Sequence, residues 1–428
     1  MKRGAFAGLG MVVIAAAGAV AHAEVVAIEG ATVWTEPGKK LDGATVVIDG
    51  KLIAAVGVGV KVPAGARKVD GRGLVVTAGF IEAASSLGLT EIDLEDSAND
   101  GSFGGGAGDE GIHAAFRVTD GYNTSSVAIP IARTGGLTSA IAAPMGGLVS
   151  GSSAWVTLAD APGVGDVVVR APLAMHVTLG DAALDSAKGS RGKAIERLRE
   201  LFDDAAAFMA RKGDYERNQT RRFAASRLDL LALGEVTARR IPLAVRAHRA
   251  SDIQAALALG RELGVRVVII GGSEAWRVAA DLARAKAGVI LDPVENMPWT
   301  FDRLYVRDDG AALLAAAGVA VAISTIGDAP GARSLRQHAG VAVAGGMPWD
   351  AALAAVTTTP ATIYGPVAKA PVRGKLVARA AADVVVWSGD PFELSTRVVH
   401  TFIGGVEQSL ENRQSALLRK YRKLPAAP

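Results

Sequence analysis

The sequence contains no cysteine among its 428 residues, and this absence excludes several kinds of site at once. Thiol nucleophiles, iron–sulfur clusters, cysteine-ligated zinc and disulfide bonds are all ruled out. Only six histidines are present, so a metal ion would have to be bound by these, by carboxylates or by a modified lysine. The chain therefore has few residues with which to build a metal centre.

Aromatic residues and net charge are also scarce. Aromatic side chains make up 5% of the chain although half of the residues are hydrophobic, so the apolar content comes mainly from alanine and valine. Such a chain can bury a sizeable core, and it lacks the low hydrophobicity and high net charge of disordered proteins. With 46 basic and 43 acidic residues the formal charge is only +3, and we expect no nucleic-acid partner.

Residues 1–23 have the three parts of a secretory signal peptide. The basic residues Lys2 and Arg3 precede an apolar stretch, and Ala21-His22-Ala23 forms a small-x-small cleavage pattern. A transmembrane anchor is the alternative, but the stretch is short and rich in alanine and glycine. We expect a mature chain that begins near Glu24, is periplasmic or secreted, and has no stable membrane span once the signal is removed.

Both ends of the mature chain have the pattern of β-hairpins. Near the N-terminus, apolar runs at 44–48 and 51–56 flank Asp49-Gly50, a dipeptide typical of tight hairpin turns because both residues tolerate positive φ. Near the C-terminus, apolar runs at 382–387 and 397–403 are separated by a Gly-Asp-Pro turn. These ends predict one small β domain assembled from both.

The middle of the chain alternates apolar strands with single helices. The expected strands are 241–248, 265–270, 288–291 and 319–324, and the expected helices are 251–263, opened by a capping box at Ser251, 274–285 and 309–317. This alternation is typical of a parallel sheet covered on both faces. Its repetition without a reversal of order favours a (β/α)8 TIM-type barrel over an open sheet.

The expected fold class is therefore α/β, a (β/α)8 barrel with a small composite β-sandwich domain. In chain order we expect a signal peptide over 1–23, the composite domain over 24–77 plus 366–408, the barrel over 78–365 and a C-terminal tail over 409–428. A glycine-rich loop at 97–111 is either a solvated insertion or a lid at the barrel mouth.

Candidate reactive residues lie where the barrel strands end. In such barrels the chemistry takes place at the C-terminal ends of the strands. His248 ends one expected strand and Asp328 follows another, so the two could share a divalent metal, or act as ligand and proton shuttle. The alternative is a structural histidine and a helix-capping carboxylate. His176 ends a further strand, and neither an HExxH nor a GxSxG motif occurs.

Several segments, taken in order, resemble the amidohydrolase superfamily, especially its imidazolonepropionase-like branch. They are the hairpin at 46–57, Thr77-Ala78-Gly79-Phe80-Ile81-Glu82, the strand end at 245–253, the helix region at 346–365 and the returning β segment at 382–391. The resemblance implies hydrolysis of non-peptide carbon–nitrogen bonds by a hydroxide on one or two divalent metal ions, with an aspartate after the eighth strand moving the proton.

At the ligand positions this chain departs from the family pattern. Ala84 and Ser86 replace the His-x-His pair after the first strand, and Gly271-Gly272 stands where the sixth strand should end in histidine. No lysine in the early or central strands could form a bridging carbamate. His248 remains in register, and Asp328 lies two places after the family's aspartate. A standard binuclear site is therefore not expected, since zinc needs about three protein ligands.

Two functions remain open. One is an exported hydrolase with either a single divalent metal such as zinc or no metal. In it His248 would bind the metal, Asp328 would be the general base, and Glu82 and His176 would be substitute ligands. The other is a non-catalytic relative without a metal, which binds a small molecule or is the partner of an active amidohydrolase paralogue or of a second copy of itself.

Overall fold

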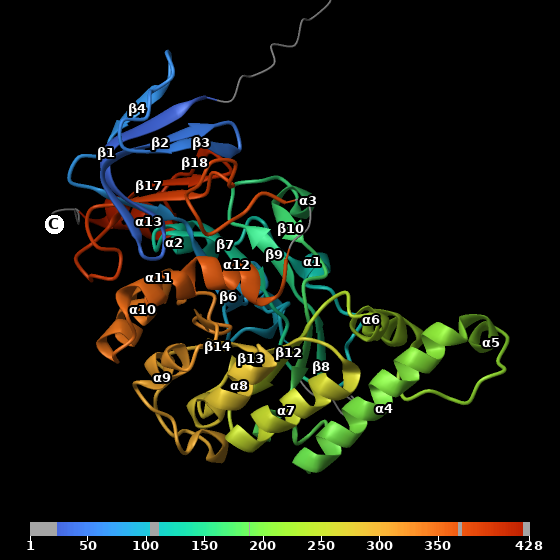
Figure 1. The fold of residues 1–428 in the computed structure, drawn as a ribbon. Coiled ribbons are helices and arrows are strands. Elements are labelled where there is room, and N and C mark those ends of the chain that lie inside the picture. Colours follow the sequence, from blue (N-terminus) through green and yellow to red (C-terminus); the bar gives the residue numbers. More distant parts are fainter. Residues whose placement is uncertain (1–23, 103–110, 188, 367–369, 423–428) are drawn as a thin grey trace, which may run out of the picture.

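The structure is a computed structural model that describes residues 24–102, 111–187, 189–366 and 370–422. It is a mixed α/β fold with one β-rich region and one region in which strands and helices alternate (Figure 1). The signal peptide expected over 1–23 lies outside the described residues, as do residues 103–110 of the glycine-rich loop.

The β-rich region is one eight-stranded sheet with strands from both ends of the chain. Its strands are β1 (Val26–Glu36), β2 (Lys39–Asp49), β3 (Leu52–Gly57), β4 (Arg67–Asp70), β5 (Val75–Ala78), β16 (Val384–Trp387), β17 (Val398–Ile403) and β18 (Val406–Glu407). They follow the order β18-β17-β16-β5-β1-β2-β3, with β4 paired to β1. The composite domain was expected to be a sandwich of two sheets, but its strands form one continuously hydrogen-bonded sheet.

The hairpin predictions are confirmed, and the two chain ends meet at β5. The turn between β2 and β3 is Gly50-Lys51, with Gly50 at φ +56°, one residue later than the predicted Asp49-Gly50 pair, because Asp49 still pairs with Leu52; β16 pairs with β17 as expected. Strand β5 pairs antiparallel with β16, so that Val76 lies opposite Val386. The blue and red strands of Figure 1 therefore belong to one hydrogen-bonded sheet, and Val46 and Phe402 pack in the same buried cluster of this region.

The remaining strands form two further sheets. The strands are β6 (Phe80–Ser85), β7 (Leu137–Ala142), β8 (Val149–Ser152), β9 (Ala154–Thr157), β10 (Val168–Arg170), β11 (Met175–Thr178), β12 (Leu243–Ala247), β13 (Val267–Gly271), β14 (Gly288–Leu291) and β15 (Val321–Ile323). One sheet has the order β10-β9-β7-β6 and the other β15-β14-β13-β12-β11-β8. The strands β11 to β15 are parallel, which confirms the alternating pattern of the middle of the chain.

An antiparallel segment links these two sheets. Strands β8 and β9 are separated only by Ser153; β8 pairs antiparallel with β11, and β9 pairs antiparallel with β7. The segment therefore lies between the parallel strands β7 and β11, where the barrel prediction requires a parallel strand. The prediction of eight parallel strands is corrected at this position, because this short run returns without a crossover helix.

The first and last parallel strands are not joined by a β ladder within the described residues. Side chains and loop backbone connect them instead: the Ser324 hydroxyl donates to the carbonyl oxygen of Ala84 (3.1 Å), and the Gly327 N–H donates to the same oxygen (3.0 Å). The Ser324 hydroxyl also donates to the carboxylate of Glu82. We call this junction of β6 and β15 the seam. A continuously hydrogen-bonded barrel, as the sequence predicts, is therefore only partly present.

Side-chain alternation divides the apolar strand residues between two cores. Val268 and Ile270 of β13 pack in one buried cluster with Ile81 and Ala322, which lie on the first and last parallel strands. Val267 and Ile269 point the other way and pack with the helices. Buried residues on both faces of a strand are the expected result of a covered parallel sheet.

Helices cover the outer face of these strands (Figure 1). The helices of the described residues are α1 (Val118–Gly121), α2 (Ala128–Arg133), α3 (Val164–Val167), α4 (Arg191–Ala210), α5 (Lys212–Glu216), α6 (Arg227–Thr237), α7 (Ala250–Leu263), α8 (Ala279–Ala285), α9 (Gly310–Ala316), α10 (Leu335–Ala344), α11 (Trp349–Val356), α12 (Thr358–Ile363) and α13 (Arg413–Tyr421), of which α7, α8 and α9 are among those that cover this face. No helix in the described ranges is both long and apolar enough to cross a bilayer.

Helix α7 begins one residue earlier than predicted, and its cap is different. Its N-cap is Arg249, with no side-chain cap bond, so the capping box at Ser251 is wrong. The buried carboxylate of Glu274 accepts a hydrogen bond from the N–H of Ala250 (3.1 Å). A side chain from the next strand–helix loop thus satisfies one of the free N–H groups of the helix start.

Candidate functional site

A polar cavity of about 390 Å³ lies at the carboxyl ends of β12 to β15. Its lining includes both residues that the sequence singled out most strongly, His248 and Asp328. Arg246, Arg303, Asp292 and His338 also face it. The cavity therefore contains charges of both signs at the place where a barrel fold presents its reactive groups.

Arg246 lies in the wall of this cavity because of strand alternation. In β12 the buried residues Leu243, Val245 and Ala247 belong to the outer core, so Ala244 and Arg246 point inward. The Arg246 guanidinium has no hydrogen bond or ion pair with any residue that the structure describes. Burial, reinforced by the positive charge of Arg303, lowers the pKa of Arg246 to about 10. It remains a cation at neutral pH without a countercharge.

His248 follows β12 and has contacts at both ring nitrogens. Nδ1 is 2.8 Å from the hydroxyl of Ser273, and Nη2 of Arg303 is 3.2 Å from Nε2. Because a guanidinium only donates, Nε2 accepts and the ring proton lies on Nδ1. Burial, followed by the charges of Arg303 and Arg246, lowers the pKa of His248 to about 3. The imidazole is therefore neutral.

Gly271 makes room for this histidine. Its φ is +98°, a value that L side chains rarely adopt, and a Cβ at this position would lie 2.5 Å from the His248 ring. The glycine that stands where the family pattern has a histidine thus leaves space for the imidazole of the neighbouring strand.

Arg303 is fixed by its neighbour. Asp302 is buried in the short 3-10 helix Phe301–Arg303. Its carboxylate accepts hydrogen bonds from the N–H of Asp181 (2.6 Å) and from Arg191 (2.5 Å). This anchor holds the segment against the strand ends, and Arg303 then contacts both His248 and Glu295 (2.8 Å).

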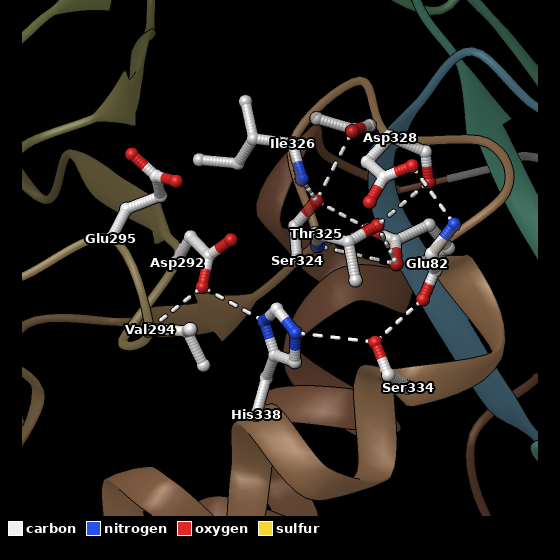
Figure 2. Close-up of polar contacts among 12 residues, drawn as sticks. Glu82, Asp292, Val294, Glu295, Ser324, Thr325, Ile326, Asp328, Ser334 and His338 are labelled. Carbon is white, nitrogen blue, oxygen red and sulfur yellow. Dashed lines mark hydrogen bonds and ion pairs between the residues drawn. The ribbon is translucent and has the colours of Figure 1, made fainter.

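Asp328 lies at the exposed rim of the cavity (Figure 2). Its Oδ1 accepts a hydrogen bond from the N–H of Gly331 at 2.8 Å. No ion pair of Asp328 occurs among the described residues. The carboxylate is thus stabilised as a turn acceptor and still faces the cavity.

Glu82 lies inside the seam and not in the cavity wall (Figure 2). It is fully buried and accepts hydrogen bonds from Ser324, from the N–H of Thr325 (3.3 Å) and from the Thr325 hydroxyl (3.2 Å). Burial outweighs these bonds and raises the pKa of Glu82 to about 7. Thr325, which does line the cavity, separates the carboxylate from it.

His176 lies on β11 and is buried, and its side chain points to the inner face of the sheet, since its neighbours Met175 and Val177 belong to the outer core. It is 4% exposed, and its Nε2 has no hydrogen-bond partner in the described structure. Burial, then the charge of Arg246, lowers its pKa to about 3. His176 is therefore neutral and does not itself line the cavity.

The sequence did not indicate the pair formed by His338 and Asp292. Nδ1 of His338 donates to Oδ1 of Asp292 at 2.8 Å, and Nε2 is 3.2 Å from the hydroxyl of Ser334 (Figure 2). Burial alone would lower the pKa of His338, but its hydrogen bond to Asp292 and the charge of that carboxylate raise it above the ordinary value. The only signal in the sequence was that Asp292 directly follows a strand.

Comparison with known proteins finds amidohydrolases. No family model matches the chain. An amidohydrolase structure from Thermotoga maritima MSB8 is similar with a TM-score of 0.80 and 25% identity, over 90% of this chain and 99% of that one. These likenesses support the amidohydrolase superfamily.

Two other relatives complete this comparison. Amidohydrolase tasK of Hapsidospora irregularis is 29% identical over 259 residues, which are 52% of this chain but only 25% of that protein. The molinate hydrolase structure is 17% identical with a TM-score of 0.54, over 91% of this chain and 95% of that one, and this likeness concerns the fold alone. By homology the chain is an amidohydrolase-type protein. These relatives do not distinguish the imidazolonepropionase-like branch.

Amidohydrolase-superfamily sites imply a divalent metal, and the donor set of this chain does not fit one. The described residues contain no group of three His, Asp or Glu side chains that could hold a metal ion. Ala84 offers no donor atom, and the hydroxyl of Ser86 donates to the carbonyl of Gly327. At His248 the guanidinium of Arg303 contacts the free nitrogen. Two guanidinium charges near one imidazole oppose binding of a further cation.

Proposed function

We propose that this amidohydrolase-type protein binds a small organic molecule in the strand-end cavity without a zinc centre. The contact between Arg303 and Nε2 of His248 carries the proposal. A neutral imidazole binds a metal through a nitrogen lone pair. Here that lone pair accepts from a guanidinium, while the other nitrogen contacts Ser273. The cavity is built to hold its polar groups in place without an ion.

Hydrolysis of a non-peptide carbon–nitrogen bond is the second candidate function. The likeness to the Thermotoga amidohydrolase over nearly its whole length favours it. Under this function Asp328 would be the general base, and His248 would be a ligand only after Arg303 had moved away. Glu82 and His176 are poorly placed as substitute ligands, because neither lines the cavity. Glu82 is hydrogen-bonded within the seam, and His176 is buried on β11.

We also propose that the protein is exported, and that it either binds a free small molecule in its cavity or associates with a partner protein. The basic start, apolar stretch and cleavage pattern at 1–23 support export to the periplasm or the medium. An active amidohydrolase paralogue or a second copy of the chain is the proposed partner. Intact mass of the exported protein tests the first point, because a chain that begins near Glu24 is expected.

Elemental analysis tests the main proposal. Mature protein, purified without chelators, is expected to contain no stoichiometric zinc, manganese, iron or nickel, and added zinc is expected to leave its Tm unchanged. His248→Ala is the matched variant. Stoichiometric metal that is lost in this variant would overturn the proposal in favour of the hydrolase.

A further inference from the structure

Two charged side chains of the strand-end cavity lack an ion-pair partner within the part of the chain that the structure describes. They are Arg246 in the wall and Asp328 at the rim. The other charged groups of the cavity are paired with one another, Arg303 with Glu295 and His338 with Asp292. The cavity thus presents one unpaired positive and one unpaired negative charge.

The unpaired guanidinium is costly to the folded protein. Arg246 is half-buried, and withdrawing a cation from water without a countercharge is unfavourable. The residues around Arg246 do not offset this, because no carboxylate of the described residues forms an ion pair with it and Arg303, in the same cavity lining, is itself a cation. An anion in the cavity would supply the missing countercharge.

Asp328 lies across the cavity from this cation. Arg246 is on β12 and Asp328 follows β15, and β13 and β14 lie between these two strands in the sheet. A ligand that reaches from one charge to the other must therefore span the cavity and carry opposite charges at its two ends.

We propose that the cavity binds a small zwitterion whose carboxylate pairs with Arg246 and whose ammonium group pairs with Asp328. The planar guanidinium fork matches the two oxygens of a carboxylate. The proposal rests on the proposed function, because it needs the cavity to be free of metal. It adds the chemical class of the ligand.

A carboxylate fits this cavity better than a phosphate does. Arg246 supplies one uncompensated positive charge, which balances a monoanion. The carboxylates of Asp292, Glu295 and Asp328 also line the cavity and would repel a dianion. A volume of about 390 Å³ suits a ligand of metabolite size.

Calorimetric titration of the full mature protein with a series of ω-amino acids tests the proposal. Glycine, β-alanine, 4-aminobutyrate and 5-aminopentanoate vary the distance between the charges, and propionate, butyrate and alkylamines of matched length carry one charge only. We expect the amino acid of best length to bind about fivefold more tightly than its matched carboxylate, and the amines not to bind. Inorganic phosphate is titrated in parallel.

Three variants assign the binding to its residues. Arg246→Met is expected to lose at least tenfold in affinity for every carboxylate, while a Tm no lower than that of the parent shows that it is folded. Asp328→Asn changes an exposed residue and is expected to remove only the preference for the amino acids. Arg284→Met, an exposed arginine paired with Asp281 on α8, is the control and should bind normally.

The outcomes separate this proposal from the one on which it rests. If the protein is metal-free but binds no carboxylate, or if Arg246→Met binds as tightly as the parent, the zwitterion proposal fails and the proposed function still stands. Phosphate binding tighter than that of every amino acid overturns the ligand class. Stoichiometric metal in the parent protein overturns both proposals.

Discussion

The seam at Glu82 and the cavity wall at Arg246 each place an ionisable side chain inside the same ring of strands, but they satisfy it differently. Glu82 accepts from Ser324 and Thr325, whereas the described residues offer no partner to Arg246. Their environments shift both pKa values toward the neutral form, because burial penalises charge in each case.

The difference separates a structural role from a binding role. A buried polar group with all its partners specifies how two elements meet, and its loss leaves those partners unsatisfied. A buried charge without partners destabilises the free protein and is retained where a ligand completes it. The following predictions test this contrast, in order of decreasing effect.

Replacement of Glu82 by alanine should have the largest effect. Glu82→Ala removes the acceptor for buried donors of Ser324 and Thr325, and should lower the free energy of unfolding by about 3 kcal/mol. Urea denaturation measures the loss. Glu82→Gln keeps an acceptor and should lose less. Equal stability of Glu82→Ala and the parent would show that the seam does not depend on this carboxyl.

Stability should also depend on pH through Glu82. Its pKa is raised from 4.5 to about 7, so between these values the folded state binds the proton and the unfolded state does not. This contribution is complete below pH 4.5 and lost as pH rises through 7. The expected change is about 3 kcal/mol. Unfolding of the parent relative to Glu82→Gln from pH 4.5 to 8 measures it, and a flat difference would contradict it.

A substitution in the cavity wall is expected to increase the free energy of unfolding, the opposite of the effect at Glu82. Arg246→Met replaces an uncompensated cation by an apolar side chain of similar length, and should raise the free energy of unfolding by about 2 kcal/mol. Thermal unfolding measures the gain. Arg284→Met, at the exposed pair on α8, should lie within about 0.5 kcal/mol of the parent. A destabilised Arg246→Met would show that the guanidinium has a structural partner.

The smallest effect is expected at the pair of His338 and Asp292. The pKa of His338 is raised, so its protonated form stabilises the fold below pH 6.5, and this contribution disappears as pH rises through the folded-state pKa. Asp292→Asn should therefore cost about 1 kcal/mol more at pH 6 than at pH 9. Denaturation at the two pH values measures this, and an equal loss at both would exclude a charged pair.

Much of the fold was predictable because it follows from local patterns. The first hairpin (to within one residue at its turn), the alternating strands and helices and the meeting of both chain ends each leave a signal within a few residues. The antiparallel segment β8–β9 did not, because its direction depends on which strands it pairs with. The prediction of the N-cap of α7 was wrong for a similar reason, since the capping carboxylate is that of Glu274, which lies in another loop.

The site was predictable only in part. His248 and Asp328 were found from their places after strands, and both line the cavity. Their chemical roles stay predictions. Arg246 was not among the predicted residues, although it lies two residues before His248 and strand alternation places both on the same inward face. The pair of His338 and Asp292 could not be seen, because 46 residues separate its members.

The pairing of β5 with β16 has a consequence for how the molecule folds. Thr77 and Trp387 are hydrogen-bonded although 310 residues separate them. The sheet cannot be completed until the last strands have been synthesised, and closing so long a loop makes its assembly a late and slow step. Until then β5 presents an open strand edge, where chains can associate wrongly. An incomplete sheet therefore leaves this edge of β5 open to pairing with another chain.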